Sequence, residues 1–116
     1  MQDKDALYLQ AILAYCRDIQ STISRFGDSF EAFSADKDYF NSISMNIMQI
    51  GEMAGKLSDE FRRDHSVAAI PWPAIRGMRI WFARRYGAVD KEMVWKTAKD
   101  DIPKLAHFCT SMIEAQ

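Results

Sequence analysis

Apolar side chains recur at helical spacing near the start of the chain and predict a helix over residues 3–26. They follow one stripe of Tyr8, Ile12, Tyr15, Ile19 and Phe26, which Leu7, Ala11 and Ile23 widen. Gly27 follows, where a residue with a left-handed backbone often ends a helix. Residues 28–34 then form a connector with room for one helical turn, which leaves Ser34 or Asp36 to cap the next helix.

A second helix is predicted over residues 36–63, where apolar positions alternate steps of three and four. This seam consists of Phe40, Ile43, Ile47, Ile50, Ala54, Leu57 and Phe61. Such spacing is typical of a helix that packs along a partner at a shallow angle. Met45, Met48 and Met53 add a second apolar flank, so we expect this helix to be buried on two sides.

Prolines and glycines divide the second half of the chain into shorter segments. Pro71 and Pro73 disfavour helical dihedrals at the residues before them, and Pro73 suits the first turn of a helix that Gly87 would end. Asp90 can cap a fourth helix, within which Pro103 marks either a kink or the start of a new helix.

No segment alternates apolar and polar residues as a half-buried strand would. We therefore predict an all-α protein, an up-and-down bundle of four to five helices. With 116 residues, the chain has the length of one domain, which we place at residues 1–116.

Composition is consistent with a soluble globular protein, since 48% of the residues are hydrophobic and 27% are charged. No run approaches the ~20 apolar residues of a membrane span. The first ten residues are acidic and amphipathic, unlike a signal peptide, so we expect a cytoplasmic protein.

Cys16 and Cys109 lie far apart in apolar helical contexts, where small buried side chains are the expected role and a disulfide or reactive thiol is the alternative. His65 and His107 do not complete a zinc motif with them. We expect neither a metal nor a cofactor.

Charge is unevenly distributed along the chain. Residues 1–60 carry 5 basic and 10 acidic side chains, and residues 61–116 carry 10 and 6, so the halves have charges of −5 and +4 and the whole −1. This asymmetry indicates either an anionic partner for the second half or the pairing of an acidic face with a basic one between subunits.

The basic charge is densest in residues 76–87, RGMRIWFARRYG, which contain Arg76, Arg79, Arg84, Arg85 and Tyr86. No acidic residue occurs from position 73 to 89. Guanidinium groups bind two phosphate oxygens at once, and an adjacent tyrosine ring can stack on a base. The stretch therefore indicates a nucleic-acid or phosphate site, with ion pairing to acids of the second helix or of another subunit as the alternative.

Residues 71–105, together with NIMQIGEMAGKLSDEF at 46–61, resemble the HepT-like branch of the HEPN superfamily. The resemblance is carried by Pro71 with Trp72, by GMR at 77–79, by the Y-G-x-V-D pattern at 86–90 and by the stretch from Trp95 to Pro103. It implies a helical bundle that forms a homodimer around the motif helix. It also implies a toxin that is a metal-independent endoribonuclease, paired with a small nucleotidyltransferase antitoxin.

The family motif is an arginine, a polar residue that is usually asparagine, about three residues, a histidine, any residue and a tyrosine that the antitoxin nucleotidylates. By this resemblance the arginine is Arg79 and the modified tyrosine is Tyr86, while Ile80 and Arg84 occupy the asparagine and histidine positions. An arginine, with a pKa above ~12, cannot accept the proton that a histidine would. We therefore take Arg79, Arg84 and Tyr86 as the candidate catalytic residues. We expect a surface that binds RNA and has lost most or all of its nuclease activity.

Three further residue types complete the candidate set. Arg76 and Arg85 are expected to assist binding. Glu52 is expected to form a buried salt bridge with Arg76 or Arg79 as a structural contact, and the functional alternative is that it helps to orient the motif arginine. His65 and His107 are alternative bases. The functions open from the sequence are a HepT-like ribonuclease toxin, a degenerate HEPN protein that binds RNA, nucleotide or a nucleotidyltransferase, and an ion-paired dimer interface.

Overall fold

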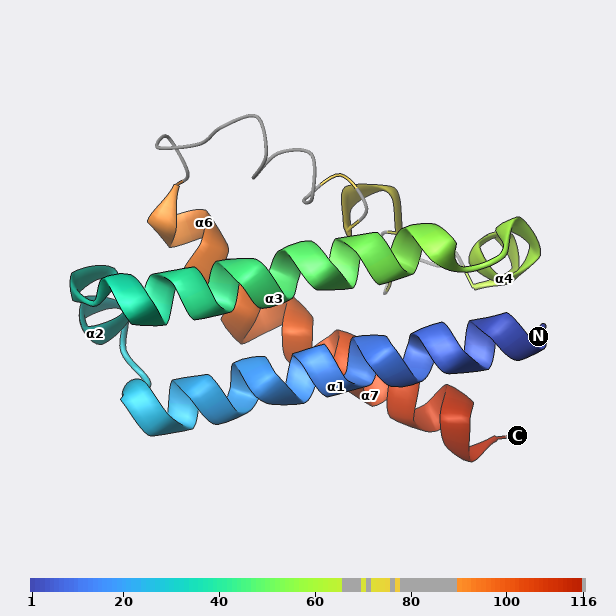
Figure 1. Ribbon diagram of the computed structural model, residues 1–116, viewed down its shortest axis with the longest axis horizontal. Helices are drawn as coiled ribbons and strands as arrows, with labels where there is room; N and C mark the ends of the chain where they lie inside the picture. Colours follow the sequence, from blue (N-terminus) through green and yellow to red (C-terminus); the bar gives the residue numbers. More distant parts are fainter. Residues whose placement is uncertain (66–69, 71, 76, 78–89, 116) are drawn as a thin grey trace.

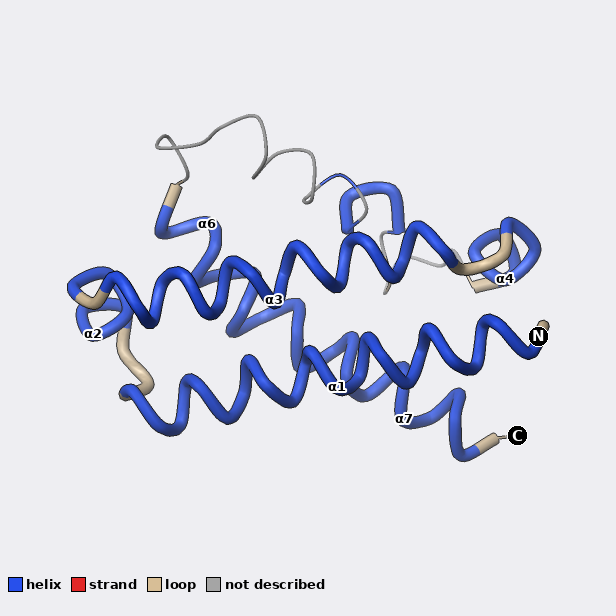
Figure 2. The backbone as a smooth tube through the Cα atoms, in the orientation of Figure 1, coloured by secondary structure: helices blue, strands red, loops and turns tan. Residues whose placement is uncertain are grey.

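The computed structural model describes residues 1–65, 70, 72–75, 77 and 90–115, and every regular element among them is helical (Figure 2). The elements are α1 (Asp3–Phe26), α2 (Phe30–Ala35), α3 (Lys37–Lys56), α4 (Asp59–Asp64), α6 (Lys91–Lys96), the π-helical stretch η1 (Thr97–Asp101) and α7 (Ile102–Glu114). The all-α prediction is confirmed for this part of the chain. None of these helices is long and apolar enough to cross a membrane.

The helices α1 and α3 run antiparallel, side by side along the long axis of the molecule (Figure 1). The helix α7 packs against α1, and the two chain ends lie at the same end of the bundle (Figure 1). Short helices close the ends, with α2 at the turn between α1 and α3 and α4 at the far end of α3 (Figure 1). The bundle is 41 Å long, close to the ~36 Å that 24 helical residues span.

The predicted bounds of α1 are confirmed, but the predicted stripe is partly wrong. The buried positions are Leu9, Ile12, Cys16, Ile19 and Ile23. Leu7 and Phe26 are 67% and 39% exposed, and the rings of Tyr8 and Tyr15 lie at the edge of the core. The stripe is displaced because α1 packs against both α3 and α7. Gly27 does end the helix at positive φ, although its ψ of 128° is extended rather than left-handed helical.

The apolar seam of the second helix is confirmed, whereas its predicted length is wrong. Every seam residue is buried except Phe40, which is half-buried. The helix α3 ends at Lys56, and a separate helix, α4, begins at Asp59. Of the predicted methionine flank, Met48 and Met53 pack against the core, but Met45 is 58% exposed.

Aromatic side chains fill the end of the bundle where α1, α2 and α3 meet. The ring of Phe33 lies 5.3 Å from that of Tyr39 and 5.1 Å from that of Trp95, measured between centroids. The hydroxyl of Tyr39 donates to the carbonyl of Gly27 at 3.0 Å. Of the two caps left open by the sequence, Asp36 is used, since its carboxylate accepts from two amides of α3.

The chain is helical without a gap from α6 through η1 to α7, but its winding changes before Pro103. In η1 the amide of Ile102 donates to the carbonyl of Thr97, five residues back. Pro103 lacks an amide hydrogen and would crowd the carbonyl four residues before it in a regular α-helix. The wider π-helical turn relieves that clash, and α7 then begins with Pro103 in its first turn.

Candidate functional site

The five predicted site residues of the arginine stretch, Arg76, Arg79, Arg84, Arg85 and Tyr86, lie outside the described residues. Their assignments therefore stay predictions. The described residues on either side of the stretch show how the chain is held where it enters and leaves this segment.

The entry side is held by Trp72, which is 1% exposed and begins a helical turn at residues 72–75. Its ring lies 5.8 Å from that of Phe108 on α7 and 6.2 Å from that of Phe61 on α4. Ile70 and Ile75 are buried on either side of it. The chain therefore enters the arginine stretch from a fixed aromatic anchor.

The exit side is held by the first turn of α6. The carboxylate of Asp90 accepts from the amides of Glu92 and Met93, as the sequence predicts. The ammonium group of Lys91 donates to the carbonyl of Ser34 at 3.0 Å and lies 5.7 Å from the centre of the Phe40 ring. These contacts attach α6 to α2 and α3, so the chain is attached to the bundle both before and after the stretch.

Glu52 is the one predicted site residue that the structure describes. It lies on α3 and is half-buried. Its predicted salt-bridge partners, Arg76 and Arg79, lie outside the described residues, so the orienting role of Glu52 stays a prediction.

A small cavity of about 80 Å³ lies beside the entry turn, between α3, η1 and α7. Its wall is mainly aliphatic and is formed by Ile47, Ile50, Ile70, Ala74, Ile75, Ile102 and Leu105, with Thr97, Asp101 and Lys104 as its polar members. A water molecule in this cavity would find few hydrogen-bond partners on such a wall.

The two histidines differ in their surroundings. The ring of His65 lies 4.5 Å from that of Phe61 and 5.8 Å from that of Phe108, so it is part of the aromatic group around Trp72. His107 is exposed on α7. The role of either as an alternative base stays a prediction.

Both cysteines are free and fully buried, which confirms the structural role expected for them. Burial raises the pKa of the thiols of Cys16 and Cys109 to about 12. They are therefore protonated at neutral pH and do not act as nucleophiles there. No group of three or more His, Cys, Asp or Glu residues within the described part of the chain could hold a metal ion.

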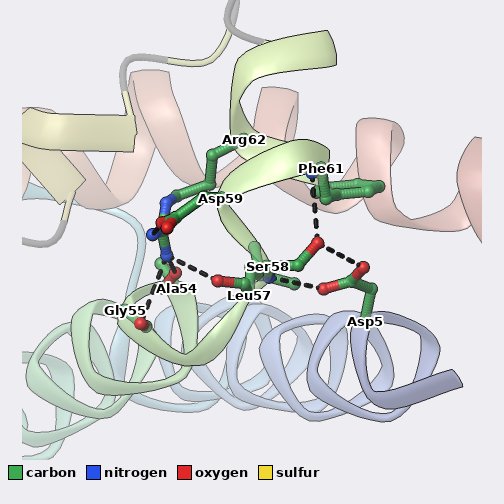
Figure 3. A network of polar contacts seen from close by, with 8 residues as sticks. All are labelled: Asp5, Ala54, Gly55, Leu57, Ser58, Asp59, Phe61 and Arg62. Carbon is green, nitrogen blue, oxygen red and sulfur yellow. Dashed lines mark hydrogen bonds and ion pairs between the residues drawn. The ribbon is translucent and has the colours of Figure 1, made fainter. Parts of the chain in front are cut away.

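A polar network between α1 and the start of α4 was missed by the sequence analysis (Figure 3). Asp5 is fully buried, and its carboxylate accepts hydrogen bonds from the amide and the hydroxyl of Ser58, both at 2.7 Å. The local signal was present, because Ser58 followed by Asp59 and Glu60 is typical of a helix start. Nothing in the sequence indicates its contact with Asp5, 53 residues away.

Comparison with known proteins gives consistent matches. The family model described as ribonuclease HepT-like matches residues 12–112. A probable ribonuclease HepT of Thermococcus cleftensis is 36% identical over 76 residues, which cover 66% of this chain and 67% of that protein. A putative RNase of Methanocaldococcus jannaschii is 30% identical over 98 residues, covering 84% of this chain and 81% of that protein.

A longer protein of the same archaeon is also similar. It is named as a gamma-glutamylcyclotransferase and putative RNase, and it is 33% identical over 93 residues. The match covers 72% of this chain but only 41% of that protein. No solved structure gave a significant match to this chain.

Proposed function

This chain belongs to the HepT-like ribonuclease family, and from that premise we propose that it binds RNA through its arginine stretch but cleaves RNA weakly or not at all. The observation that carries the proposal is the extent of the family match. It covers residues 12–112, and therefore the bundle and the whole of the motif from Arg79 to Tyr86. The relatives named as ribonucleases support RNA as the ligand.

The weak cleavage follows from the chemistry of the motif. A ribose 2′-hydroxyl that attacks the neighbouring phosphate must lose a proton, and the leaving oxygen must gain one. A histidine suits this exchange because its pKa is close to the working pH, whereas Arg84 stays charged and can only stabilise negative charge on the phosphate. Loss of such a group typically lowers the rate about 10²–10⁴-fold, and Tyr86 is the proton donor that the motif retains.

Binding is tested by titrating purified protein with a labelled tRNA pool at several salt concentrations. Phosphate contacts release counterions, so the affinity should fall steeply as salt rises, and Arg79→Ala should both weaken binding and flatten that dependence. An affinity that does not change with salt would contradict the RNA-binding proposal.

We further propose that the protein is the toxin component of a toxin–antitoxin module and that a nucleotidyltransferase modifies Tyr86. This rests on the HepT-like pattern around Tyr86. A small nucleotidyltransferase encoded by the adjacent gene should add nucleotide mass to the wild-type protein and not to Tyr86→Phe, as read by mass spectrometry. Equal mass in both variants after incubation would contradict the assignment.

Homodimerisation around the motif helix is part of the same proposal. Light scattering should give twice the chain mass of 13.4 kDa. If the arginines served as an ion-paired interface instead of an RNA site, Arg84→Ala would convert the dimer to a monomer without a change in RNA affinity.

A further inference from the structure

The chain breaks its helical path between α3 and α4 although the apolar pattern does not. Leu57 and Ser58 have ψ values of 149° and 151°, which are extended, while Ala54, Leu57 and Phe61 keep the spacing of one continuous helix. A break leaves amides and carbonyls without helical partners, and buried ones cost free energy unless another group satisfies them.

The carbonyls at the end of α3 are satisfied by one guanidinium group. The Nη1 atom of Arg62 donates to the carbonyls of Ala54, Gly55 and Leu57, at 3.1, 3.2 and 2.7 Å, and its Nη2 atom pairs with Asp59. A cation at a helix C-terminus is also favoured by the helix dipole. Figure 3 shows this side of the break.

The amide side of the break is satisfied from another helix. Asp5 of α1 accepts from the amide and hydroxyl of Ser58, and the hydroxyl oxygen of Ser58 accepts from the amide of Phe61 at 3.1 Å (Figure 3). The carboxylate also accepts from the amide of Gln2 at 3.1 Å. A buried carboxylate is tolerated where hydrogen bonds of this kind surround it, so the position of α4 depends on α1.

The position of α4 in turn fixes the anchor of the arginine stretch. Phe61, whose amide the Ser58 hydroxyl holds, packs its ring against those of Trp72 and Phe108, 6.2 Å from each. Trp72 begins the turn at residues 72–75, and Arg76 is the next residue in the chain. A continuous path of hydrogen bonds and ring contacts therefore leads from Asp5 to the start of the stretch.

We propose that Asp5 is a positioning residue for the RNA-binding segment, acting through Ser58, Phe61 and Trp72. The inference rests on the proposed function for its effect on RNA and on the structure alone for its effect on Trp72. Asp5 touches no substrate in this scheme. It keeps α3 from continuing into α4 and so sets the position of Trp72, from which the chain continues into the arginine stretch.

The test compares Asp5→Asn and Ser58→Ala with Asp3→Asn, which removes the same charge from an exposed position in the same first turn. Three quantities are measured on each full-length protein: hydrogen exchange of the Phe61 amide, the NMR shift of the Trp72 indole N–H, and the affinity for the tRNA pool. The indole N–H is a clean reporter because it is buried and makes no hydrogen bond to the described residues.

Asp5→Asn and Ser58→Ala should speed exchange at Phe61, shift the Trp72 resonance and weaken RNA binding ~5-fold or more, whereas Asp3→Asn should change none of the three. Ser58→Thr, which unlike Ser58→Ala keeps the hydroxyl, should give the wild-type values of all three quantities. The effects of the two substitutions should be less than additive in the double variant, because both remove the hydrogen bond between the Ser58 hydroxyl and the Asp5 carboxylate.

The proposal would be overturned if the Phe61 amide exchanged fast while the Trp72 resonance and the RNA affinity stayed unchanged. Asp5 would then stabilise only the break between α3 and α4. If Asp5→Asn does not fold, Ser58→Ala decides, because it keeps the carboxylate and the Ser58 amide. If the wild-type protein binds no RNA, the proposed function fails, and the Trp72 resonance alone decides the role of Asp5.

Discussion

The buried carboxylate of Asp5 is the clearest case in which the contacts of one side chain determine a property of this protein. Burial alone would raise the pKa of this carboxyl, but the hydrogen bonds from Ser58 and Gln2 outweigh it, and the pKa lies below the ordinary value of 3.8. A carboxyl with a lower pKa in the folded state adds stability above its unfolded pKa and loses that contribution as the pH falls through the folded one.

The free energy of unfolding should therefore decrease below a pH of about 4, more steeply for the wild-type protein than for Asp5→Asn. Urea unfolding at a series of acidic pH values measures this slope. Asp3→Asn, which removes an exposed carboxylate from the same turn of α1, is the matched control. Parallel curves for wild-type and Asp5→Asn would show that the carboxylate is not stabilised in the fold.

The environments of some single residues could be predicted from the sequence and those of others could not. The burial of Cys16 and Cys109 could be predicted because each lies among apolar neighbours on its own helix. The contact of Asp5 with Ser58 could not, because helical periodicity carries no information about which polar groups meet across the bundle.

Helix ends were harder to predict than helices themselves. The bounds of α1 followed from its apolar spacing and from Gly27, and Asp36, which caps α3, was one of the two caps that the sequence left open. The break after Lys56 did not, since the apolar seam runs through it and the groups that satisfy it come from Asp5 and Arg62. Periodicity describes the core face, whereas side-chain capping decides where a helix stops.

Arg62→Ala tests the capping of α3. The side chain is 14% exposed, and its loss leaves three carbonyls without their donor, so we expect the free energy of unfolding to fall by about 1.5–3 kcal/mol. Arg17→Ala, which removes an exposed arginine from α1, is the control and should be close to neutral. Equal effects of the two substitutions would mean that only net charge matters.

Gly27→Ala tests the termination of α1. Gly27 has a φ of 117° and a ψ of 128°, a combination that is strained for any residue with a Cβ atom. Alanine there should lower the free energy of unfolding by roughly 1–3 kcal/mol. The same substitution at Gly77, where an added Cβ meets no described atom within 4 Å and φ is not positive, should not lower stability. Thermal unfolding of the two variants gives the comparison.

The whole molecule combines an acidic first half with a basic second half on one small bundle. Trp72, before the arginine stretch, and Lys91, after it, are both held against the same body of α2, α3, α4 and α7. This arrangement is compatible with the RNA-binding proposal, because the chain on both sides of the basic segment is anchored to the bundle. Family membership and the helical architecture agree. The proposed loss of cleavage depends on one position of the motif, Arg84.

The most direct test of the account is metal-free cleavage of a labelled tRNA pool by the wild-type protein, Arg84→His and Arg84→His/Ile80→Asn, with binding measured in parallel. We predict that the wild-type protein binds RNA and cleaves it no faster than Arg79→Ala, and that restoring the histidine raises cleavage about 10²-fold or more. Rapid cleavage by the wild-type protein, unchanged or lowered by Arg84→His, would contradict the claim that position 84 limits the chemistry.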